Sequence, residues 1–215
     1  MPKCINNNQY NQYLSALISG KRRSCHEIVD QIKNKMTSIT YLYSQLFQES
    51  LYEVGRLWEF NQISVAVEHA ATAITESLMN NVYADIEQAD NKSLRVISTS
   101  APNEYHQIGA KMVADLFEMN GWDTWYLGAN TPTLELIHLA EDIKPHVIAV
   151  SLSVYFHLSD LTEMIQTIQK KITGSTIIIG GQAFRHGNGI EFAGQFSDVY
   201  YIKSLDHLEN FINSF

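Results

Sequence analysis

The sequence predicts an α/β protein of two parts, an N-terminal four-helix bundle followed by a flavodoxin-like sheet of five parallel strands. After residue 90, short apolar runs alternate with helical segments, a pattern typical of βα repeats around a parallel sheet. Before it, apolar residues recur at the spacing of a helix that packs in a bundle. One such stripe consists of Tyr43, Leu46, Leu51, Val54 and Leu57. The polar stretch 90–93 separates the parts, so we expect domains at 1–90 and 91–215.

In the N-terminal part, the apolar pattern predicts helices at about 5–19, 24–37, 39–60 and 63–88. Ser24 is a favourable N-cap residue for the second helix, and Glu27 follows it at the spacing of a capping box. This pair therefore predicts the start of the second helix at residue 24.

In the C-terminal part, apolar runs bounded by turn residues predict the strands and the helices that connect them. The strands are expected at 94–99, 123–127, 146–153, 176–180 and 198–202. The helices are expected at 106–120, 132–143, 158–172, 188–195 and 204–214. Gly121, Pro145 and Gly174 fall at helix ends, as βα repeats require. No Gly-x-Gly-x-x-Gly follows the first strand, so nicotinamide binding has no support in the sequence.

Composition limits the class of protein. At 215 residues, with 45% hydrophobic and 18% charged residues, the chain can bury a core in each of two modest domains. No apolar run reaches the length of a membrane span, and the N-terminus lacks the apolar core of a signal peptide. Cys4 and Cys25 are too few for a disulfide framework, so we expect a cytoplasmic protein. The net charge of −8 argues against direct nucleic-acid binding.

The segment Glu104-Tyr105-His106-Gln107-Ile108-Gly109 follows the first predicted strand and places an imidazole in a turn before a helix. In an open parallel sheet, ligands bind outside the carboxyl ends of the strands, where the strand order reverses. Two further strand ends carry matching features, which are Ser153 and the pair Gly180-Gly181. A metal-bound imidazole is usually held by a carboxylate on its other nitrogen, and Glu104 is close enough in sequence to supply it. The three strand ends predict a site for a large planar ligand.

This constellation resembles the cobalamin-binding domain family, whose pattern is Asp-x-His-x-x-Gly, then Ser-x-Leu, then Gly-Gly. The resemblance implies that His106 is the lower axial ligand to cobalt. It implies that Glu104, which stands in place of the usual Asp, orients that imidazole from behind. Gly109 would let the nucleotide tail of the cofactor pass close to the backbone.

The same resemblance assigns the other two strand ends to the nucleotide tail. Ser153 would contact the buried dimethylbenzimidazole, and Gly180-Gly181 would leave room for it. Tyr155 stands at the Leu position of the family pattern. This departure changes the shape that we expect for the tail pocket.

The helical part carries Trp58 and, after nine intervening residues, Glu68-His69. This spacing resembles the cap of light-sensing CarH-type cobalamin regulators. The resemblance implies that Trp58 packs over the upper axial group, that Glu68 contacts the adenosyl moiety, and that His69 takes the vacated cobalt position after light breaks the Co–C bond. The alternative is that Trp58 is a core residue, while Glu68 and His69 are surface neighbours.

Our primary interpretation is an adenosylcobalamin-binding light sensor or regulator that is not itself an enzyme. CarH-type regulators carry an N-terminal DNA-binding domain, and the few residues ahead of the predicted cap leave no room for one. The output is therefore expected to pass through a protein partner such as a transcription regulator, or through a change in homo-oligomeric state. Such a switch needs two conformations that bind the cofactor states with different affinity.

Two alternatives stay open. The first is a corrinoid shuttle protein of a methyltransferase system, which would bind methylcobalamin, and whose size and domain order fit equally well. Of the run Gly-Asp-x-His-Asp-Ile-Gly-Lys typical of those proteins, this chain keeps only His106, Ile108 and Gly109. The second is a sensor of the same fold that binds haem or a bilin, which Tyr155 and the many histidines allow.

Overall fold

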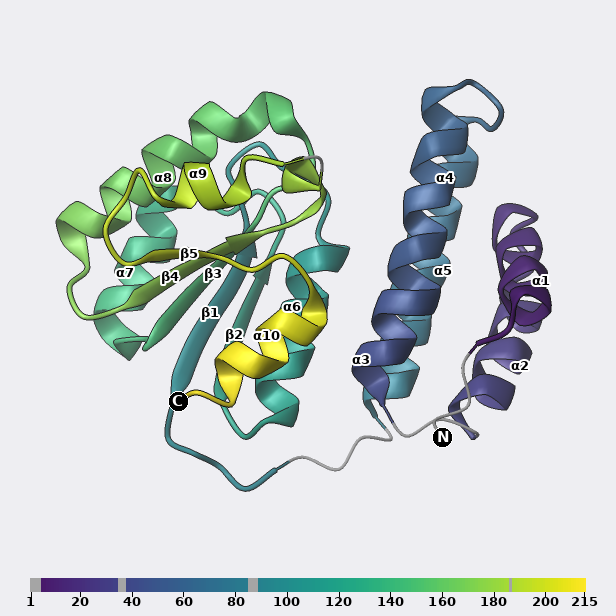
Figure 1. Ribbon diagram of the computed structural model, residues 1–215, viewed down its shortest axis with the longest axis horizontal. Coiled ribbons are helices and arrows are strands. Elements are labelled where there is room, and N and C mark those ends of the chain that lie inside the picture. Colours follow the sequence, from purple (N-terminus) through teal and green to yellow (C-terminus); the bar gives the residue numbers. More distant parts are fainter. Residues whose placement is uncertain (1–4, 35–37, 85–88, 186) are drawn as a thin grey trace. The chain divides into compact units, whose positions relative to one another are not determined.

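The computed structural model describes residues 5–34, 38–84, 89–185 and 187–215 (Figure 1). The chain divides into two compact units, Met1–Ile86 and Glu87–Phe215. The first unit is helical, and the second is a five-stranded parallel sheet with helices on both faces. The predicted fold class is therefore confirmed. Every helix within the described residues is too short or too polar to cross a lipid bilayer.

The helical unit contains four helical segments in its described residues. They are α1 (Asn7–Ile18), α2 (Arg22–Lys33), the run of α3 (Ile39–Leu42), a π-helical segment (Tyr43–Gln48) and α4 (Glu49–Glu59), and finally α5 (Val65–Tyr83). The third segment fills the helix predicted at 39–60, and its stripe buries Tyr43, Leu46 and Val54. The predicted helix ends at 35–37 and 85–88 lie outside the described residues.

The core of this unit is apolar, and it draws on each of the four segments. Tyr13 and Leu17 of α1, Phe47 and Leu78 are almost completely buried, and the rings of Tyr13 and Phe47 lie 6.1 Å apart. Helix α1 packs against α2, α4 and α5. Burial of one apolar face per helix is what holds short helices together in water.

The capping box expected at Ser24 is wrong. Helix α2 already begins at Arg22, so Ser24 lies inside it, and Glu27 accepts a hydrogen bond from Arg23 Nε at 3.0 Å instead. The reason is the preceding turn, where Gly20 has φ +66° and the Lys21 N–H donates to the Ala16 carbonyl at 2.9 Å. This glycine-dependent helix ending turns the chain early and starts α2 two residues sooner.

The sheet unit has five parallel strands in the order β2-β1-β3-β4-β5. They are β1 (Arg95–Ser100), β2 (Asp123–Gly128), β3 (Val147–Ser151), β4 (Thr176–Gly180) and β5 (Val199–Tyr201). This is the flavodoxin order, in which the direction of winding reverses between β1 and β3. At that point Ser151 pairs with Ser100 on one side and with Gly180 on the other. The ends of the three central strands are therefore level with one another.

Helices cover both faces of the sheet (Figure 1). Helices α6 (Ile108–Met119) and α10 (Leu205–Ile212) lie on one face, and α7 (Thr133–Ile143), α8 (Leu158–Lys171) and α9 (Gly189–Ala193) lie on the other. Short 3-10 turns at Tyr155–His157 and Gln182–Phe184 follow β3 and β4. The strands are apolar and buried because both faces are covered, which is usual for parallel sheets.

The predicted linker, where it is described, is bound to the sheet unit. The Lys92 N–H donates to the Gly121 carbonyl at 2.8 Å, and Asn91 Nδ2 donates to Asp123 Oδ1 at 2.7 Å. Gly121 has φ +81°, and a Cβ atom there would lie 2.1 Å from the Asp90 carbonyl oxygen. Only glycine allows the linker to approach the α6–β2 turn this closely.

We therefore expect Gly121→Ala to destabilise the protein more than Gly174→Ala does. Both glycines have a positive φ, but no atom lies within 4 Å of a Cβ built at Gly174. The Gly174 variant should lose about 1–2 kcal/mol from the left-handed backbone alone. The Gly121 variant should lose a further 1–3 kcal/mol or so from the collision. Urea unfolding of both variants checks this, and equal losses would contradict it.

Candidate functional site

Glu104 lies in the turn after β1, and only 1% of its surface is exposed. The Glu104 N–H donates to the Ala101 carbonyl at 3.1 Å and closes that turn. Its carboxylate Oε2 accepts hydrogen bonds from the backbone N–H groups of Ser153, at 2.9 Å, and Val154, at 2.8 Å. Oε1 accepts from the backbone N–H of His106 at 3.0 Å. One buried side chain thus joins the loop after β1 to the loop after β3.

These contacts also determine the charge of Glu104. Burial by itself raises the pKa of a carboxyl group, because it penalises the charged form. Here the hydrogen bonds from the His106 ring and from the backbone N–H groups of His106, Val154 and Ser153 outweigh burial and lower the pKa of Glu104 to about 2. The side chain is therefore an anion at neutral pH.

The imidazole of His106 is oriented by this anion. Its Nδ1 atom lies 2.5 Å from Glu104 Oε1, and 55% of the side-chain surface is exposed. An ionised carboxylate only accepts hydrogen bonds, so Nδ1 carries a proton, and in the neutral ring the lone pair is then on Nε2. A neutral imidazole held from behind by a carboxylate is the usual form of a histidine that ligates a metal.

Within the described residues, no group of three or more His, Cys, Asp and Glu side chains could hold a metal ion alone. A metal at this site would therefore have to bring most of its ligands with it, as the cobalt of a corrinoid does. The Glu104–His106 pair fits such a cofactor, because it offers a single oriented nitrogen.

Gly109 lies in the first turn of α6, where a Cβ atom would be 3.0 Å from the hydroxyl oxygen of Ser151. Ser153 was predicted to be the serine that contacts the nucleotide tail, but the hydroxyl beside Gly109 belongs to Ser151. Ser153 contributes its backbone N–H to Glu104 instead. Strand alternation cannot separate the two serines, because residues two apart share a face; they differ in that Ser151 is the last residue of β3, whereas Ser153 lies beyond its end.

The glycine pair after β4 allows close contact between backbones. A Cβ atom at Gly180 would lie 2.9 Å from the Ile202 carbonyl oxygen. Gly181 has φ +111°, and its Cβ would lie 2.3 Å from the Leu152 carbonyl oxygen. Both glycines therefore bring together the loops at the carboxyl edge of the sheet. Their predicted role beside a nucleotide tail stays a prediction.

Large apolar side chains are exposed in the two loops that Glu104 joins. Tyr105, Val154 and Tyr155 are exposed, and Phe156 is 85% exposed. Exposed apolar surface next to a polar centre marks a ligand or partner site. Of these residues, only Tyr155 was a predicted site residue, because it stands at the Leu position of the family pattern.

Trp58, Glu68 and His69 belong to the helical unit. Trp58 lies in the last turn of α4 and is 48% exposed, so it is not a core residue. Glu68 lies in the first turn of α5, with Oε2 2.5 Å from His69 Nδ1 and Oε1 accepting a hydrogen bond from Thr72 at 3.0 Å. The His69 side chain is 75% exposed. The structure therefore shows a second imidazole–carboxylate pair.

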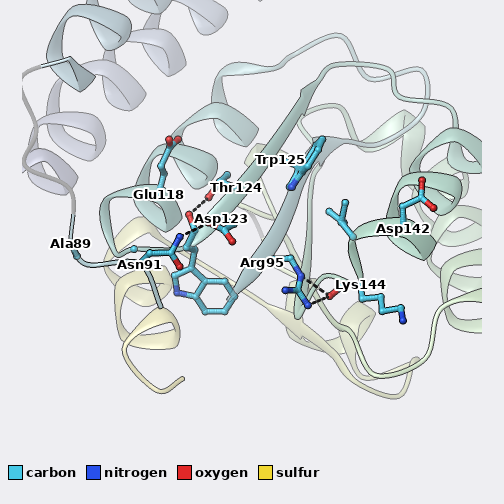
Figure 2. Close-up of a pocket in the computed structure, with 12 residues that line it drawn as sticks. Ala89, Asn91, Arg95, Glu118, Asp123, Thr124, Trp125, Asp142 and Lys144 are labelled. Atoms are coloured by element: carbon cyan, nitrogen blue, oxygen red, sulfur yellow. Dashed lines mark hydrogen bonds between the residues drawn. The ribbon is translucent and has the colours of Figure 1, made fainter. Parts of the chain in front are cut away.

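A cavity of about 760 Å³ opens at the amino ends of the strands, near the start of β1 and β2 (Figure 2). Its polar groups serve the local structure, because Arg95 donates to the Lys144 carbonyl at 3.3 and 3.2 Å and Asn91 donates to Asp123. Its lining includes neither Glu104 nor His106. Ligands of open α/β sheets bind at the carboxyl ends of the strands, where His106 lies, so the candidate functional site is at that end of the sheet.

The fold is the Rossmann-like one found in corrinoid-binding proteins. Residues 94–188 match a B12 binding domain family, and residues 9–83 match a second family with the same description. Together the two matches span most of the chain. The cofactor class that such domains indicate is a corrinoid.

Two solved structures from Methanosarcina barkeri are similar in fold. The monomethylamine corrinoid protein matches with a TM-score of 0.83 and 12% identity, over 98% of this chain and 100% of that chain. The methanol:cobalamin methyltransferase complex MtaBC matches with a TM-score of 0.53 and 15% identity, over 98% of this chain and 80% of that chain. No curated protein matches the sequence.

Replacing the central carboxylate is expected to destabilise the fold. Glu104→Ala removes the acceptor of three part-buried backbone N–H groups and of the His106 ring. Leaving such donors unsatisfied should cost about 3 kcal/mol. Glu163→Ala, at an exposed position of α8, is the matched control and should change stability by less than about 0.5 kcal/mol. Urea unfolding at pH 7 measures both, and a loss in Glu104→Ala no larger than in the control would contradict the argument.

The same contribution should depend on pH in one direction. The pKa of Glu104 is about 2 in the folded protein, against about 4.3 for an unperturbed Glu. Its charge therefore stabilises the fold fully above about pH 5, and this stabilisation is lost as the pH falls toward 2. The stability difference between wild type and Glu104→Gln should be constant from pH 7 to 5 and shrink below that.

Proposed function

We propose that the protein is a corrinoid carrier of a methyltransferase system, which presents its cofactor first to an enzyme that delivers a methyl group and then to one that removes it. The observation that carries this proposal is the Glu104-oriented imidazole of His106 at the carboxyl edge of a B12 binding domain. The two similar structures support it, because one is a corrinoid protein for monomethylamine and the other is a methanol methyltransferase complex.

The cobalt of a bound corrinoid can accept a methyl group and release it again. Of this chain's residues, His106 would hold the cobalt through Nε2, and Glu104 would keep the proton on Nδ1. Because the other oxygen of Glu104 is bound to the N–H groups of Ser153 and Val154, the ring orientation is set before any cofactor binds. Such preorganisation saves the free energy of ordering the site on binding.

The nucleotide tail of the cofactor would enter beside Gly109, whose missing side chain leaves the space next to the Ser151 hydroxyl. The exposed rings of Tyr105, Tyr155 and Phe156 offer apolar surface for the corrin. The methyl donor would be a small methylated compound such as methanol or a methylamine, bound by the partner enzyme. The carrier itself is then not a catalyst.

A light sensor that binds adenosylcobalamin is the second candidate, and the pair in the helical unit favours it. Glu68 holds Nδ1 of His69, so the lone pair of that ring is on Nε2 whenever Nδ1 is the donor. An exposed imidazole in this form suits a ligand that binds cobalt only after photolysis. The output would pass through a protein partner such as a transcription regulator, or through a change in oligomeric state.

Reconstitution with a corrinoid tests the proposed carrier. We expect wild-type protein to bind methylcobalamin, and the reduced cobalt(II) form to show splitting of its electron paramagnetic resonance by one histidine nitrogen. In His106→Ala that splitting should disappear, and the affinity for the corrinoid should fall by at least about tenfold. This is the loss of metal affinity usual when a group of a metal site is mutated. His138→Ala, at an exposed position of α7, is the control and should behave as wild type.

The outcomes separate the candidate functions. Methyl transfer from methanol or a methylamine to the bound cofactor, with the matching methyltransferase added, supports the carrier. Failure to bind any corrinoid would overturn the proposal and direct attention to haem or a bilin. Retention of the nitrogen splitting in His106→Ala would remove His106 from its assigned role.

Illumination distinguishes the carrier from the light sensor. If the protein is a carrier, green light on the adenosylcobalamin-bound form should leave its oligomeric size unchanged. Any spectral change should then be the same in wild type and in His69→Ala. If it is a sensor, wild type should form a bis-histidine spectrum in the light, and His69→Ala should lose that spectrum while keeping dark binding. Absorption spectra and size-exclusion chromatography before and after light measure both.

A further inference from the structure

Asn130, in the loop after β2, contacts three consecutive residues of the segment that carries His106. Its Oδ1 accepts a hydrogen bond from the Asn103 N–H at 2.9 Å, its own N–H donates to the Glu104 carbonyl at 3.0 Å, and its Nδ2 donates to the Tyr105 hydroxyl at 3.3 Å. Residues 103–107 are called the ligand loop below. A single side chain and its backbone thus hold most of this loop.

The backbone of Asn130 is suited to this contact. It has φ +52°, in the left-handed region that asparagine adopts more readily than most residues. Asn103, on the other side of the contact, has φ +62°. Two asparagines in this unusual conformation meet beside Glu104, and such positions persist where the surrounding structure fixes them.

Glu104 is therefore held from two directions. From the β3 side, the N–H groups of Ser153 and Val154 bind its carboxylate, and from the β2 side Asn130 binds its carbonyl. The Tyr126 hydroxyl of β2 also donates to the Gln107 carbonyl at 3.2 Å, at the far end of the ligand loop. The carboxylate reaches His106 Nδ1 only if the backbone of Glu104 stays in place.

The geometry points to Asn130 as a positioning residue for His106, which fixes the backbone of the ligand loop so that the Glu104 carboxylate meets the imidazole. This inference rests on the proposed function, since the role of His106 as an axial ligand belongs to it. Asn130 acts on His106 through its hydrogen bonds with Asn103, Glu104 and Tyr105, and not by direct contact with the imidazole.

Substitutions at residue 130 can separate the side chain from the backbone. Asn130→Gly keeps the positive φ and the N–H to Glu104 but removes both side-chain contacts. Asn130→Asp keeps an oxygen for the Asn103 N–H and can accept a hydrogen bond from the Tyr105 hydroxyl. It should therefore keep the ligand loop in place, as wild type does. Ser93→Gly is the matched control, because Ser93 also has a positive φ, of +57°, but lies before β1 at the other edge of the sheet.

Two measurements follow these variants. In the protein without cofactor, hydrogen exchange reports the opening of the His106, Ser153 and Val154 N–H groups that bind Glu104. In the protein loaded with cobalt(II) corrinoid, the nitrogen splitting reports the ratio of histidine-bound to histidine-free cobalt. We expect Asn130→Gly to raise the exchange rates and to lower that ratio by about tenfold, the size expected for losing two modest hydrogen bonds.

Wild-type exchange rates and an unchanged ratio in Asn130→Gly would overturn the inference, as would an equal effect in Ser93→Gly. If wild-type protein binds no corrinoid, the proposed function fails, but the exchange rates still test whether Asn130 holds the ligand loop. If Asn130→Gly does not fold, Tyr105→Phe removes only the Nδ2 contact and should lower the ratio by about twofold. No change in Tyr105→Phe would then count against the inference.

Discussion

The buried carboxylate of Glu104 is the interaction on which the candidate site depends. A charge removed from water is costly unless hydrogen bonds replace its hydration. Glu104 obtains these bonds from His106 and from the backbone after β3, and so the two loops must adopt one mutual arrangement. The orientation of the imidazole is thus a consequence of satisfying a buried anion, and it does not require a bound cofactor.

The glycine pair at the carboxyl ends of the strands is explained by backbone packing. Gly180 and Gly181 are needed because carbonyl oxygens of Ile202 and Leu152 occupy the places where their side chains would be. A protein with this fold could keep these glycines whatever it bound. The Glu104–His106 pair, which the fold alone does not require, therefore points to a corrinoid more strongly than the glycine pattern does.

The sequence predicted five parallel strands in a flavodoxin-like sheet, because the alternation of strands and helices is a local pattern. It also predicted that Glu104 can reach His106, because the two residues are close along the chain. It could not find Asn130, whose contacts join two loops that are more than twenty residues apart. The family pattern was matched at Ser153, whereas the hydroxyl beside Gly109 belongs to Ser151, because β3 ends two residues earlier than the predicted strand. The start of α2 was wrong because the turn at Gly20 dominates over the capping preference of Ser24.

The two imidazole–carboxylate pairs differ in a way that suits different tasks. Glu104 is buried and bound by backbone donors, so His106 is held in one orientation at all times. Glu68 accepts a hydrogen bond from the Thr72 hydroxyl, and His69 is largely exposed, so water competes for the His69 ring. Under the proposed function, the ring of His106 would be oriented before a corrinoid binds, whereas the ring of His69, exposed to water, is less fixed. The carrier would need only the oriented ring of the sheet unit, and the sensor would need both rings.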